Sequence, residues 1–477
     1  MKIVDHQNTK IVATVGPACS SYEQLLALAV AGVNIFRLNF SHGTHEDHLK
    51  VIRHVGAINE QHNLYIGILA DLQGPKLRVG KMKDGKLPIK AGDILTFVNE
   101  ECIGDKEKIY MSYQQFAQDV KIGEKVLVDD GKLEFEVVDT NGIDTVKLKV
   151  LFGGFLSSNK GVNLPNTEIS LPSMTDKDER DLAFILTQPV NWIALSFVRT
   201  GKDMKRLAKK IRVAKHPAKT IAKIEKPEAI ANIDAIIRES NAIMVARGDL
   251  GIEVPMEQLP TLQKDIVQRC NQRSRPVIVA TQMMDSMIEN PSPTRAEIMD
   301  VANAVLDGTD AVMLSGETSV GKHPILVVEA MNKIIAETEK HFSFAGKRPK
   351  PAKKSRTFFS DAICLNAAKL SEDINAKAIV GMTTSGYTAF KVSSFRPKAE
   401  IFIFSDQDYM LATLNLVWGV KCFYYDKFTT TDETIVDVTH ILKQKGQLKE
   451  GDTVVNLGSM PIKQRYRTNM MKITVVD

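Results

Sequence analysis

The sequence predicts an α/β protein: a (β/α)8 barrel with an all-β lid domain inserted after its third strand and an open α/β domain at its C-terminus. Three observations predict this fold. Short β-branched runs alternate with helix-period segments, one connection of about 120 residues interrupts them, and a second alternation follows a basic run with prolines. The expected boundaries are 1–73 and 171–345 for the barrel, 74–170 for the lid, 346–356 for a linker and 357–477 for the last domain.

Eight short apolar runs are expected to form the barrel strands. Helix-period segments such as 22–31, 227–239, 256–274 and 295–306 separate them. Parallel strands that are buried on both faces are continuous apolar runs, and eight β-then-α units close into a barrel. The expected strands cover 10–16, 34–39, 65–72, 192–198, 220–225, 242–248, 276–282 and 311–316.

The connection between the third and fourth runs is unusual, because a βα loop usually has about 2–6 residues. Short strands are expected inside it at 94–98, 125–128, 133–138 and 145–150. Asp130-Gly131 and Asn141-Gly142 indicate hairpin turns, since glycine accepts the positive φ that tight turns require. Active sites of such barrels lie on the face where this loop emerges, so the insertion is placed to act as a lid.

A basic run with prolines follows the barrel at 347–356. It fits either a binding patch or a solvated linker, and its composition favours the linker. Beyond it, helices are expected at 361–370, 387–395, 409–418 and 432–445, and strands at 378–382, 401–404, 421–425, 453–458 and 472–476. This alternation predicts a separate open α/β domain.

The composition narrows the classes of function. With 62 basic and 57 acidic side chains, the formal charge of +5 is too small and too evenly spread to indicate nucleic acid or a membrane surface as a partner. The longest apolar stretch, near 25–33, is far shorter than the ~20 residues of a membrane helix, and residues 1–6 lack the apolar core of a secretory signal. Five scattered cysteines indicate buried thiols of a reducing compartment. We therefore expect a cytoplasmic protein.

Polar residues follow the expected barrel strands at their carboxyl ends, where the fold itself does not need them. Any one of them fits a structural ion-pair network, but together at one barrel rim they indicate an active site. They are Arg37, Asn39, Ser41, His42, Asp71, Ser196, Lys223, Glu225, Arg247, Gly248, Asp249, Thr281, Gln282, Ser315 and Glu317.

Glu225 and Asp249 are expected to bind a divalent cation. They end adjacent strands, which lie roughly 5 Å apart, and two oxygen ligands at that separation suit Mg²⁺ or Mn²⁺. No His or Cys accompanies them, which disfavours zinc. Lys223 precedes Glu225 by two residues and points to the same side of the strand. Such a lysine beside a bound cation is typical of phosphoryl chemistry, and Arg37 supplies a planar fork for phosphate or carboxylate.

The segment 316–323 has the glycine and lysine spacing of a P-loop. His323, however, stands where a P-loop has the Ser or Thr that binds Mg²⁺, and Glu317 lies inside the loop. We interpret the segment as a glycine-rich entry to a helix.

Several motifs together resemble the pyruvate kinase family. They are 9–17, 37–43, 221–228, 244–251 and the longer stretch 280–304. The resemblance runs from about residue 10 to the C-terminus and is densest in the barrel. It implies phosphoryl transfer from phosphoenolpyruvate to ADP, giving ATP and pyruvate, with Mg²⁺ or Mn²⁺. It also implies that the insertion is the family's mobile domain, that the last domain is regulatory, and that the chain forms a homotetramer.

Carried over position by position, the resemblance implies roles for the rim residues. Arg37 would hold the transferring phosphate, Lys223 would stabilise the phosphoryl group, and Thr281 would lie where the enolate is protonated. Glu225 and Asp249 would bind the divalent cation. The implied pyruvate contacts are Gly248, Asp249 and Thr281, with Ser196 and Ser315 in support, and the implied nucleotide contacts are Asn39, His42, Arg78 and Lys160.

The resemblance also implies a monovalent-cation site made of Asn39, Ser41, Asp71 and the carbonyl of Leu72. Here the chain departs from the common pattern, because Lys76 stands where many members have glutamate. A lysine ammonium is a compact charge that can occupy the position of K⁺. We expect activity that needs little or no K⁺; the alternative is a surface lysine near an ordinary K⁺ site.

A possible effector site lies in the last domain, where a strand ends and a helix begins. Helix N-termini with hydroxyls bind phosphate, and some members of the family use this segment for sugar phosphates. The glycine-rich loop of sugar-bisphosphate-activated members is absent, and Lys463, Arg465 and Arg467 stand there instead. A plain helix cap is the alternative, and a regulator with one phosphate stays open. The residues concerned are Thr383, Thr384, Ser385, Gly386 and Thr388.

Two other functions compete with this interpretation. A different Mg²⁺-dependent phosphoenolpyruvate or pyruvate barrel, such as an aldolase or lyase, would share the paired carboxylates but has no use for a lid that carries Arg78 and Lys160 against a nucleotide. A catalytically silent paralogue would have no reason to keep Arg37, Lys223 and Thr281 together with both carboxylates.

Overall fold

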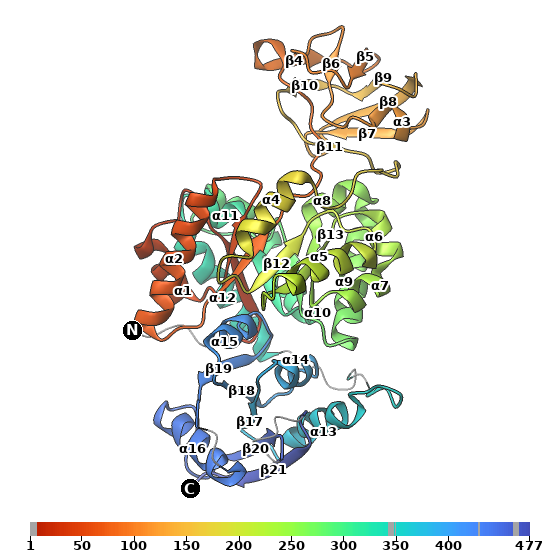
Figure 1. The fold of residues 1–477 in the computed structure, drawn as a ribbon. Helices are drawn as coiled ribbons and strands as arrows, with labels where there is room; N and C mark the ends of the chain where they lie inside the picture. The colour runs from red at the N-terminus through yellow and green to blue at the C-terminus, as the bar shows by residue number, and fades with distance from the viewer. Residues whose placement is uncertain (1–6, 342–347, 349, 428–429, 461–466) are drawn as a thin grey trace.

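The computed structural model describes residues 7–341, 348, 350–427, 430–460 and 467–477. Three bodies of secondary structure are stacked in a column, with a closed barrel in the middle, a β-sheet module at the top and an α/β body at the bottom (Figure 1). Each body has its own buried hydrophobic clusters. Residues 1–6, on which the expectation about a secretory signal rests, lie outside the described residues.

The middle body confirms the predicted (β/α)8, or TIM, barrel. Its strands are all parallel and follow one another around the barrel in the order of the chain. Each expected run contains a strand, and most strands end earlier than expected because the polar rim residues leave the hydrogen-bonded ladder. The strands are β1 (Lys10–Thr14), β2 (Ile35–Asn39), β3 (Gly67–Asp71), β12 (Trp192–Leu195), β13 (Lys219–Ile224), β14 (Ala242–Ala246), β15 (Val277–Ala280) and β16 (Ala311–Leu314).

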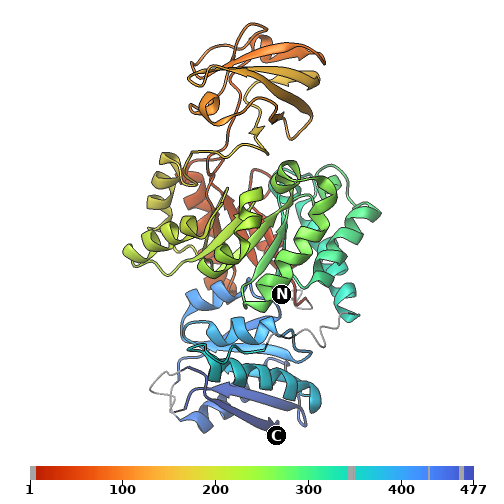
Figure 2. The ribbon, with the colours of Figure 1, turned by 90° about the vertical axis from the view of Figure 1, so that its right-hand side faces the viewer.

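Helices surround these strands, as the two perpendicular views show (Figure 2). Five of them begin at capping boxes, whose N-cap residues are Ser21, Thr44, Thr175, Thr200 and Thr294. The helices are α1 (Tyr22–Ala31), α2 (His45–His62), α4 (Asp176–Ile185), α5 (Gly201–Val213), α6 (Pro227–Ala231), α7 (Ile233–Glu239), α8 (Arg247–Glu253), α9 (Leu259–Gln272), α10 (Arg295–Asp307), α11 (Gly316–Ser319) and α12 (Pro324–Lys340), with a 3₁₀ turn η3 (Asp285–Ile288).

Two expected barrel helices are wrong in detail. The segment 227–239 is two helices, α6 and α7, because Asn232 between them has φ −103° and ψ 12°. The segment 256–274 begins as the 3₁₀ turn η2 (Met256–Gln258), and the α-helix α9 starts only at Leu259, with Pro260 in its first turn. Proline is tolerated there because the first helical N–H groups have no partner within the helix.

The top body is all-β except for two short helical pieces, α3 (Phe116–Asp119) and η1 (Lys83–Gly85). The Asn141-Gly142 hairpin is confirmed, since Gly142 has φ 68° between β8 and β9. One sheet has the order β11 (Val162–Asn163), β7 (Lys125–Val128), β8 (Leu133–Thr140), β9 (Thr145–Phe152), β5 (Ile94–Val98) and β6 (Ile109–Tyr110), and β10 (Gly154–Ser157) pairs with β4 (Lys86–Ile89).

The bottom body is a five-stranded sheet in the order β19-β18-β17-β20-β21, of which only β21 is antiparallel to its neighbour. Its strands are β17 (Ala378–Met382), β18 (Glu400–Ser405), β19 (Val420–Tyr424), β20 (Thr453–Gly458) and β21 (Met470–Val475). Its helices are α13 (Phe358–Asp373), α14 (Tyr387–Ser394), α15 (Asp408–Leu414) and α16 (Thr431–Gln444).

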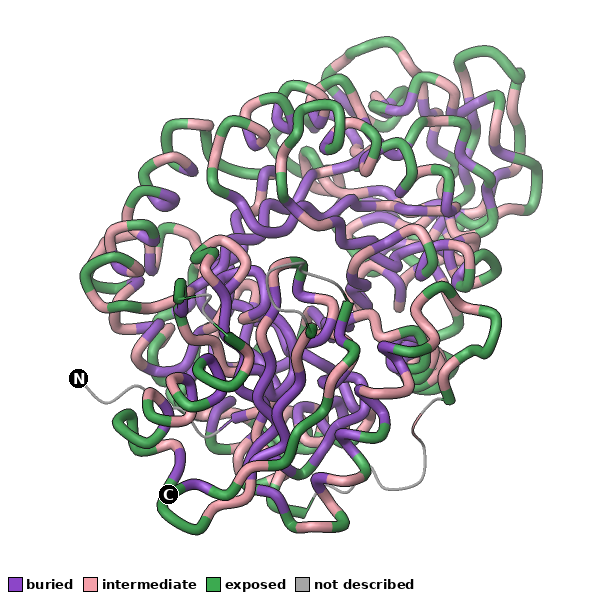
Figure 3. Tube along the Cα trace, turned by 60° about the horizontal axis from the view of Figure 1, so that its bottom comes forward, coloured by how far each residue is buried: buried purple, intermediate pink, exposed green. Residues whose placement is uncertain are grey.

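The bottom body closes the lower end of the barrel. Leu416 and Phe390 pack into the cluster of side chains inside the barrel, and buried segments of the chain run through the barrel strands and the lower sheet (Figure 3). A buried ion pair joins the two bodies, with Nη2 of Arg396 3.0 Å from Oδ2 of Asp310 and the side chains 1% and 4% exposed. The carboxyl ends of the barrel strands are left facing the top body.

One residue of the expected linker, Arg348, contacts the bottom body. Residues 346, 347 and 349 lie outside the described residues. Arg348 is not solvated, because its guanidinium pairs with Glu372 and donates through Nε to the carbonyl of Phe395 at 2.8 Å. None of the helices in the described part of the chain is long and apolar enough to cross a membrane.

Candidate active site

The carboxyl ends of the barrel strands meet at four buried charged residues, Arg37, Asp71, Lys223 and Glu225, which we call the rim cluster. Nε and Nη2 of Arg37 lie 2.7 and 2.6 Å from Oδ2 of Asp71. Nζ of Lys223 lies 2.9 Å from Oε1 of Glu225 and 3.4 Å from Oδ1 of Asp71. Three different strand ends, those of β2, β3 and β13, therefore supply one continuous ion network.

Burial makes the charges of the rim cluster depend on one another. The side chains of Asp71 and Glu225 are each 1% exposed. Burial opposes the charged form of Lys223, but Asp71 and Glu225 outweigh this effect and raise the pKa of its ammonium group. Burial also opposes ionisation of Asp71, yet Lys223 and Arg37 lower the pKa of its carboxyl group. Lys223 is therefore a cation at neutral pH, and Asp71 is its permanent counter-ion.

Ser196 connects Lys223 to the main chain. Nζ of Lys223 donates to Oγ of Ser196 at 2.7 Å, and that hydroxyl donates to the carbonyl of Leu72, also at 2.7 Å. Ser196 directly follows β12 and is 1% exposed. The ammonium group is consequently held in position by a hydrogen bond to Ser196 and by ion pairs with Glu225 and Asp71, of which the contact with Oδ1 of Asp71 is the longest.

Glu225 and Asp249 do not occupy equivalent positions. Glu225 directly follows β13, whereas Asp249 lies in the first turn of α8. The expectation that Asp249 ends a strand is wrong, because β14 stops at Ala246 and the chain turns at once into a helix. Burial raises the pKa of the Glu225 carboxyl, Lys223 opposes the rise, and the charge of nearby Asp249 adds to it.

This pair of carboxylates fits a hard divalent cation. Their oxygens are the ligands that Mg²⁺ and Mn²⁺ prefer, and their mutual repulsion is what a cation would relieve. The Asp249 carboxylate has no hydrogen-bond or ion-pair partner among the described residues. No group of three or more His, Cys, Asp or Glu side chains suited to a metal gathers within the described part of the chain, so water and substrate oxygens would have to complete the coordination.

Thr281 and Gly248 meet beside the start of α8. The N–H of Gly248 donates to Oγ1 of Thr281 at 2.7 Å, and that hydroxyl donates to the carbonyl of Ala280 at 2.6 Å. Thr281 has φ 71°, a value that β-branched residues rarely adopt. Backbone strain of this kind persists only where the surroundings enforce it, and it concentrates at functional sites. The segment is therefore a candidate substrate contact.

A cavity of about 700 Å³ opens beside the rim cluster and is lined by four of the polar rim residues and by Thr14, among others. Those four are Arg37, Asn39, His42 and Ser315. Burial lowers the pKa of His42, and four nearby cations lower it further: Arg78, Lys76, Arg37 and Lys177. A neutral imidazole among several cations favours an anionic ligand in this cavity.

The two lid residues expected to contact the nucleotide are placed differently. Nη1 of Arg78 donates to the carbonyl of Asn159 at 2.9 Å, and its charge reaches His42 at the rim. Nζ of Lys160 instead lies 2.8 Å from Oδ1 of Asp129 within the top body. Arg78 therefore acts on the barrel rim in this conformation, while Lys160 is held by its own module.

The groups of the expected monovalent-cation site lie on neighbouring strand ends. The N–H of Ser41 donates to Oδ1 of Asn39 at 3.1 Å, and Oδ1 of Asp71 is buried without a hydrogen-bond partner. Lys76 is exposed, and its Cε lies 3.6 Å from the position that a Cβ on Gly161 would take. Its stem thus follows the connection between the barrel and the top body.

Two charged rim residues serve the fold. Nη1 of Arg247 lies 2.6 Å from Oδ1 of Asp300, and Glu317, 1% exposed, accepts from the N–H of Ser315 at 2.6 Å. The segment 316–323 does open a helix, α11, directly after β16. Its second glycine is required by packing, because a Cβ on Gly321 would lie 2.2 Å from the carbonyl oxygen of Glu317.

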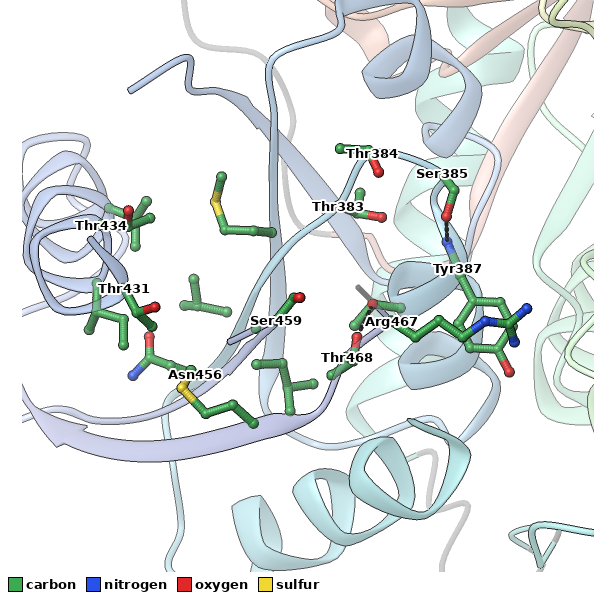
Figure 4. A pocket seen from close by; sticks show the side chains of 18 residues that line it. Thr383, Thr384, Ser385, Tyr387, Thr431, Thr434, Asn456, Ser459, Arg467 and Thr468 are labelled. Carbon is green, nitrogen blue, oxygen red and sulfur yellow. Dashed lines mark hydrogen bonds between the residues drawn. The ribbon is translucent and has the colours of Figure 1, made fainter. Parts of the chain in front are cut away.

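A second cavity, of about 150 Å³, lies in the bottom body at the start of α14 (Figure 4). Four of the five expected effector residues line it, and Gly386 caps the helix with φ 79° while its N–H donates to Oγ1 of Thr383 at 2.9 Å. Arg467 lies over the ring of Tyr387, 5.7 Å from its centre. Lys463 and Arg465 lie outside the described residues. The four lining residues are Thr383, Thr384, Ser385 and Thr388.

Sequence reasoning missed several groups at the site. Oγ1 of Thr14 accepts from Nη1 of Arg37 at 3.0 Å; its place at the end of β1 is the same signal that revealed the other rim residues. The N–H of Phe197 donates to Oε2 of Glu225 at 2.6 Å. Almost any residue at this position could make this main-chain contact, so the sequence contains no signal for it. The buried pair of Lys226 and Glu253 was also unforeseen.

Three of the five cysteines, Cys19, Cys270 and Cys364, are buried, but Cys102 and Cys422 are partly exposed, which corrects the expectation that all are buried. All five thiols are free.

Comparison with known proteins identifies relatives of the whole chain. A family model described as "Pyruvate kinase, barrel domain" matches residues 6–328, and one described as "Pyruvate kinase, alpha/beta domain" matches residues 361–474. A pyruvate kinase of Geobacillus stearothermophilus is 40% identical over 99% of this chain and 81% of its own length. Pyruvate kinase 2 of a Synechocystis species is 44% identical over 98% and 79%. A solved pyruvate kinase structure from Cryptosporidium parvum superimposes with a TM-score of 0.93 at 34% identity, covering 99% of this chain and 97% of the other.

Proposed function

The chain belongs to the pyruvate kinase family, and from this premise we propose how its residues transfer a phosphoryl group from phosphoenolpyruvate to ADP. It is an enzyme of the phosphotransferase class. The observation that carries the proposal is the rim cluster, in which the buried cations Arg37 and Lys223 pair with the carboxylates of Asp71 and Glu225 at the mouth of the barrel. The phosphorus–oxygen bond of phosphoenolpyruvate breaks, a bond to an oxygen of ADP forms, and the released enolate takes up a proton.

Arg37 would hold the transferring phosphate. A guanidinium group has five N–H donors, and three of those of Arg37 have protein partners, two on Asp71 and one on Thr14. Two donors are left for a phosphate oxygen. Because Asp71 and Thr14 fix the plane of the group, little side-chain freedom is lost when the phosphate binds.

Lys223 would stabilise the phosphoryl group during transfer, when negative charge spreads over its three equatorial oxygens. Its contact with Oδ1 of Asp71, at 3.4 Å, is the longest of its three. A phosphoryl oxygen can replace that contact while Ser196 and Glu225 continue to hold the ammonium group. The charge is therefore already positioned before the reaction begins.

Glu225 and Asp249 would hold Mg²⁺ or Mn²⁺, which when bound neutralises charge on the substrate oxygens. The main-chain amides of Gly248 and Asp249 and the hydroxyl of Thr281 would orient the pyruvate carboxylate. The N–H of Gly248 and the hydroxyl of Thr281 now donate to Thr281 and Ala280, so the carboxylate would replace these two contacts when it binds. With its carboxylate fixed in this way, the enolate presents one face to the Thr281 hydroxyl and nearby water, where protonation would occur.

The cavity of about 700 Å³ beside Arg37 would take ADP. Asn39 and His42 line it, and Ser315 supports it from the eighth strand. Arg78 and Lys160 of the top body would meet the nucleotide phosphates when that module moves towards the barrel. We therefore keep 74–170 as the proposed bounds of a lid domain, with 1–73 and 171–345 as the barrel and 357–477 as a regulatory domain.

Formation of ATP tests this function directly. Purified enzyme with phosphoenolpyruvate, ADP and Mg²⁺ is expected to produce ATP and pyruvate in equal amounts, with pyruvate measured by its reduction in a coupled assay. An aldolase or lyase would consume phosphoenolpyruvate without forming ATP, and a catalytically silent relative would leave both substrates unchanged. Either result would contradict the proposal.

We further propose that Lys76 reduces the need for K⁺, a cation that the family generally uses. The charge of Lys76 already reaches His42, which adjoins the proposed monovalent-cation residues Asn39 and Ser41. Replacing K⁺ by tetramethylammonium is expected to lower the turnover number less than about tenfold, because the ammonium group supplies the missing charge.

The matched variants sharpen this test. Lys76→Glu is expected to become dependent on K⁺, whereas Lys81→Glu, an exposed lysine of the same connection, is expected to behave as the parent. A parent enzyme that loses more than tenfold without K⁺ would show that Lys76 is an ordinary surface residue.

The cavity at the start of α14 is proposed as the site of an effector with one phosphate group. Nine hydroxyl-bearing residues and one cation, Arg467, line it, and five of the nine lie around the helix N-terminus. Glucose 6-phosphate, ribose 5-phosphate and AMP are the probes, and at least one is expected to lower the phosphoenolpyruvate concentration at half-maximal rate in the parent but not in Arg467→Ala. If none of the three compounds changes the phosphoenolpyruvate concentration at half-maximal rate, the segment is a plain helix cap.

Members of the family typically form oligomers, and we propose a homotetramer here. β21 is an edge strand with Met471, Ile473 and Val475 exposed by 38%, 47% and 61%, which supports pairing with a second copy. Light scattering is expected to give the mass of four chains, and the mass of one chain would exclude the proposal.

We also propose a cytoplasmic location, supported by the five free thiols; recovery in a membrane fraction would contradict it.

A further inference from the structure

We propose that the buried ion pair between Lys226 and Glu253 is a positioning clamp that sets the separation of the two metal-binding segments. This inference rests on the proposed role of Glu225 and Asp249 as ligands of the divalent cation. Lys226 is the residue after Glu225, and Glu253 lies four residues after Asp249, one turn further along α8. The clamp therefore joins the backbone of one ligand to the helix of the other.

The contact is short and enclosed. Nζ of Lys226 lies 2.7 Å from Oε1 of Glu253, and the two side chains are 6% and 1% exposed. Lys226, Asp249 and Glu253 line the same small cavity of about 30 Å³. Taking two charges out of water is costly, and the cost is recovered only where the geometry of the pair is well defined. Such a pair therefore favours one relative position of the two segments.

Asp249 depends on its helix for its position. Its carboxylate has no partner of its own in the described part of the chain, and α8 has only seven residues. The start of the helix is held by the contact of Gly248 with Thr281 and by the pair of Arg247 with Asp300. Its end is held through Glu253, which contacts Lys226 of the barrel and Asn163 of the top body. Without Lys226, the end of the helix that carries Asp249 would lose its charged contact with the segment that carries Glu225.

The ligand separation matters because Mg²⁺ and Mn²⁺ bind oxygens at narrowly defined distances. Residues that orient metal ligands from behind are typically worth about 10–100-fold in metal affinity. The same Glu253 oxygen also accepts from Nδ2 of Asn163 in β11, at 2.8 Å. One carboxylate oxygen of α8 therefore contacts both the barrel and the top body. The other oxygen, Oε2 of Glu253, is buried without a hydrogen-bond partner.

The test is the affinity of the full-length, metal-free enzyme for Mn²⁺ without substrates, measured from the electron paramagnetic resonance signal of free Mn²⁺. Lys226→Met is expected to weaken binding about tenfold or more. The double variant Lys226→Met/Glu253→Gln leaves no unpaired buried charge, which protects folding, and is expected to weaken binding to a similar extent. Lys226→Arg keeps the charge and the donors and is expected to bind within about threefold of the parent.

The matched control is the buried pair at the opposite end of the barrel. Arg396→Met/Asp310→Asn removes an ion pair of similar burial and is expected to lower the thermal midpoint while leaving the Mn²⁺ affinity unchanged. Lys226→Met/Glu253→Gln must therefore differ from this control in metal affinity and not only in stability.

The outcomes separate the clamp from the proposed function. If the parent binds Mn²⁺, Asp249→Asn abolishes binding, and the Lys226/Glu253 double variant binds as tightly as the parent, the clamp is overturned and the proposed metal site stands. If the parent binds no Mn²⁺, the proposed metal site fails and the clamp fails with it. Should Lys226→Met not fold, the double variant and Lys226→Arg decide the question by the same measurement.

Discussion

Lys223→Met is expected to lower the turnover number by about 10³-fold, the upper end of the loss on removing one positioned donor from developing negative charge. Methionine has a similar length but no charge, so the phosphoryl group would lose its stabilising cation while the shape of the site is kept. Because Arg37 still pairs with Asp71 at 2.6 Å, the phosphate subsite would remain. Turnover under saturating phosphoenolpyruvate, ADP and Mg²⁺ is the measurement.

The same variant removes a buried cation from between two carboxylates, so its stability must be followed. Breaking a buried pair costs about 3–5 kcal/mol, and the thermal midpoint is expected to fall. Mn²⁺ affinity is expected to change little, since Glu225 and Asp249 remain. Lys322→Met is the control. Lys322 follows the eighth barrel strand, and its ammonium group also pairs with a carboxylate, 2.5 Å from Glu289, but its side chain is 64% exposed. The turnover number of this variant should equal that of the parent. Near-parental turnover of a folded Lys223→Met would remove Lys223 from the reaction.

Glu225→Gln is expected to weaken Mn²⁺ binding by at least about 100-fold. Loss of a residue that only orients a metal ligand costs up to about 100-fold in affinity, and loss of a ligand should cost at least as much. Glutamine keeps the size of the side chain and one carbonyl acceptor for the N–H of Phe197, but it loses the charge that a divalent cation needs. The ratio kcat/KM for phosphoenolpyruvate is expected to fall together with the metal affinity. Titration with Mn²⁺, followed by the resonance signal of the free ion, gives the affinity independently of the rate.

Glu339→Gln provides the control for a lost buried carboxylate. Glu339 lies near the end of α12, where its oxygens accept from the N–H groups of Asn8 and Thr9 at 2.8 and 2.7 Å. Its replacement is expected to lower stability and to leave Mn²⁺ binding unchanged. Equal metal affinity in Glu225→Gln and the parent would assign the cation to other ligands and would remove the carboxylate pair as the metal site.

Much of the fold could be predicted because periodicity is a local property. The apolar runs that became β13 and β14 are buried on both faces, and the polar residues after them mark the rim without any knowledge of the contacts. The breaks were harder to predict. Asn232 divides one expected helix into two, and Arg247 begins a helix where a strand was expected, because these choices depend on how the chain packs against its neighbours.

The candidate site shows the same division between local and long-range information. Lys223 lies in β13 and Glu225 directly follows that strand, so their proximity follows from their spacing of two residues. Asp71 comes from another strand, and only the closed barrel shows that it pairs with both Arg37 and Lys223. Arg247 is charged and lies at the carboxyl end of a barrel strand, as Lys223 does. Only the tertiary structure shows that Arg247 forms an ion pair with Asp300.

The sequence by itself determined the barrel, the two additional modules, the family and the side chains that gather at the rim, because each of these follows from residue types at short spacings. The tertiary structure decided which charges neutralise one another, that Asp249 is carried by a helix, and that Lys226 meets Glu253 across 27 positions of the chain. The physical reason is that the electrostatic environment of a group depends on distances of a few ångströms, and those distances are set by the closure of the barrel.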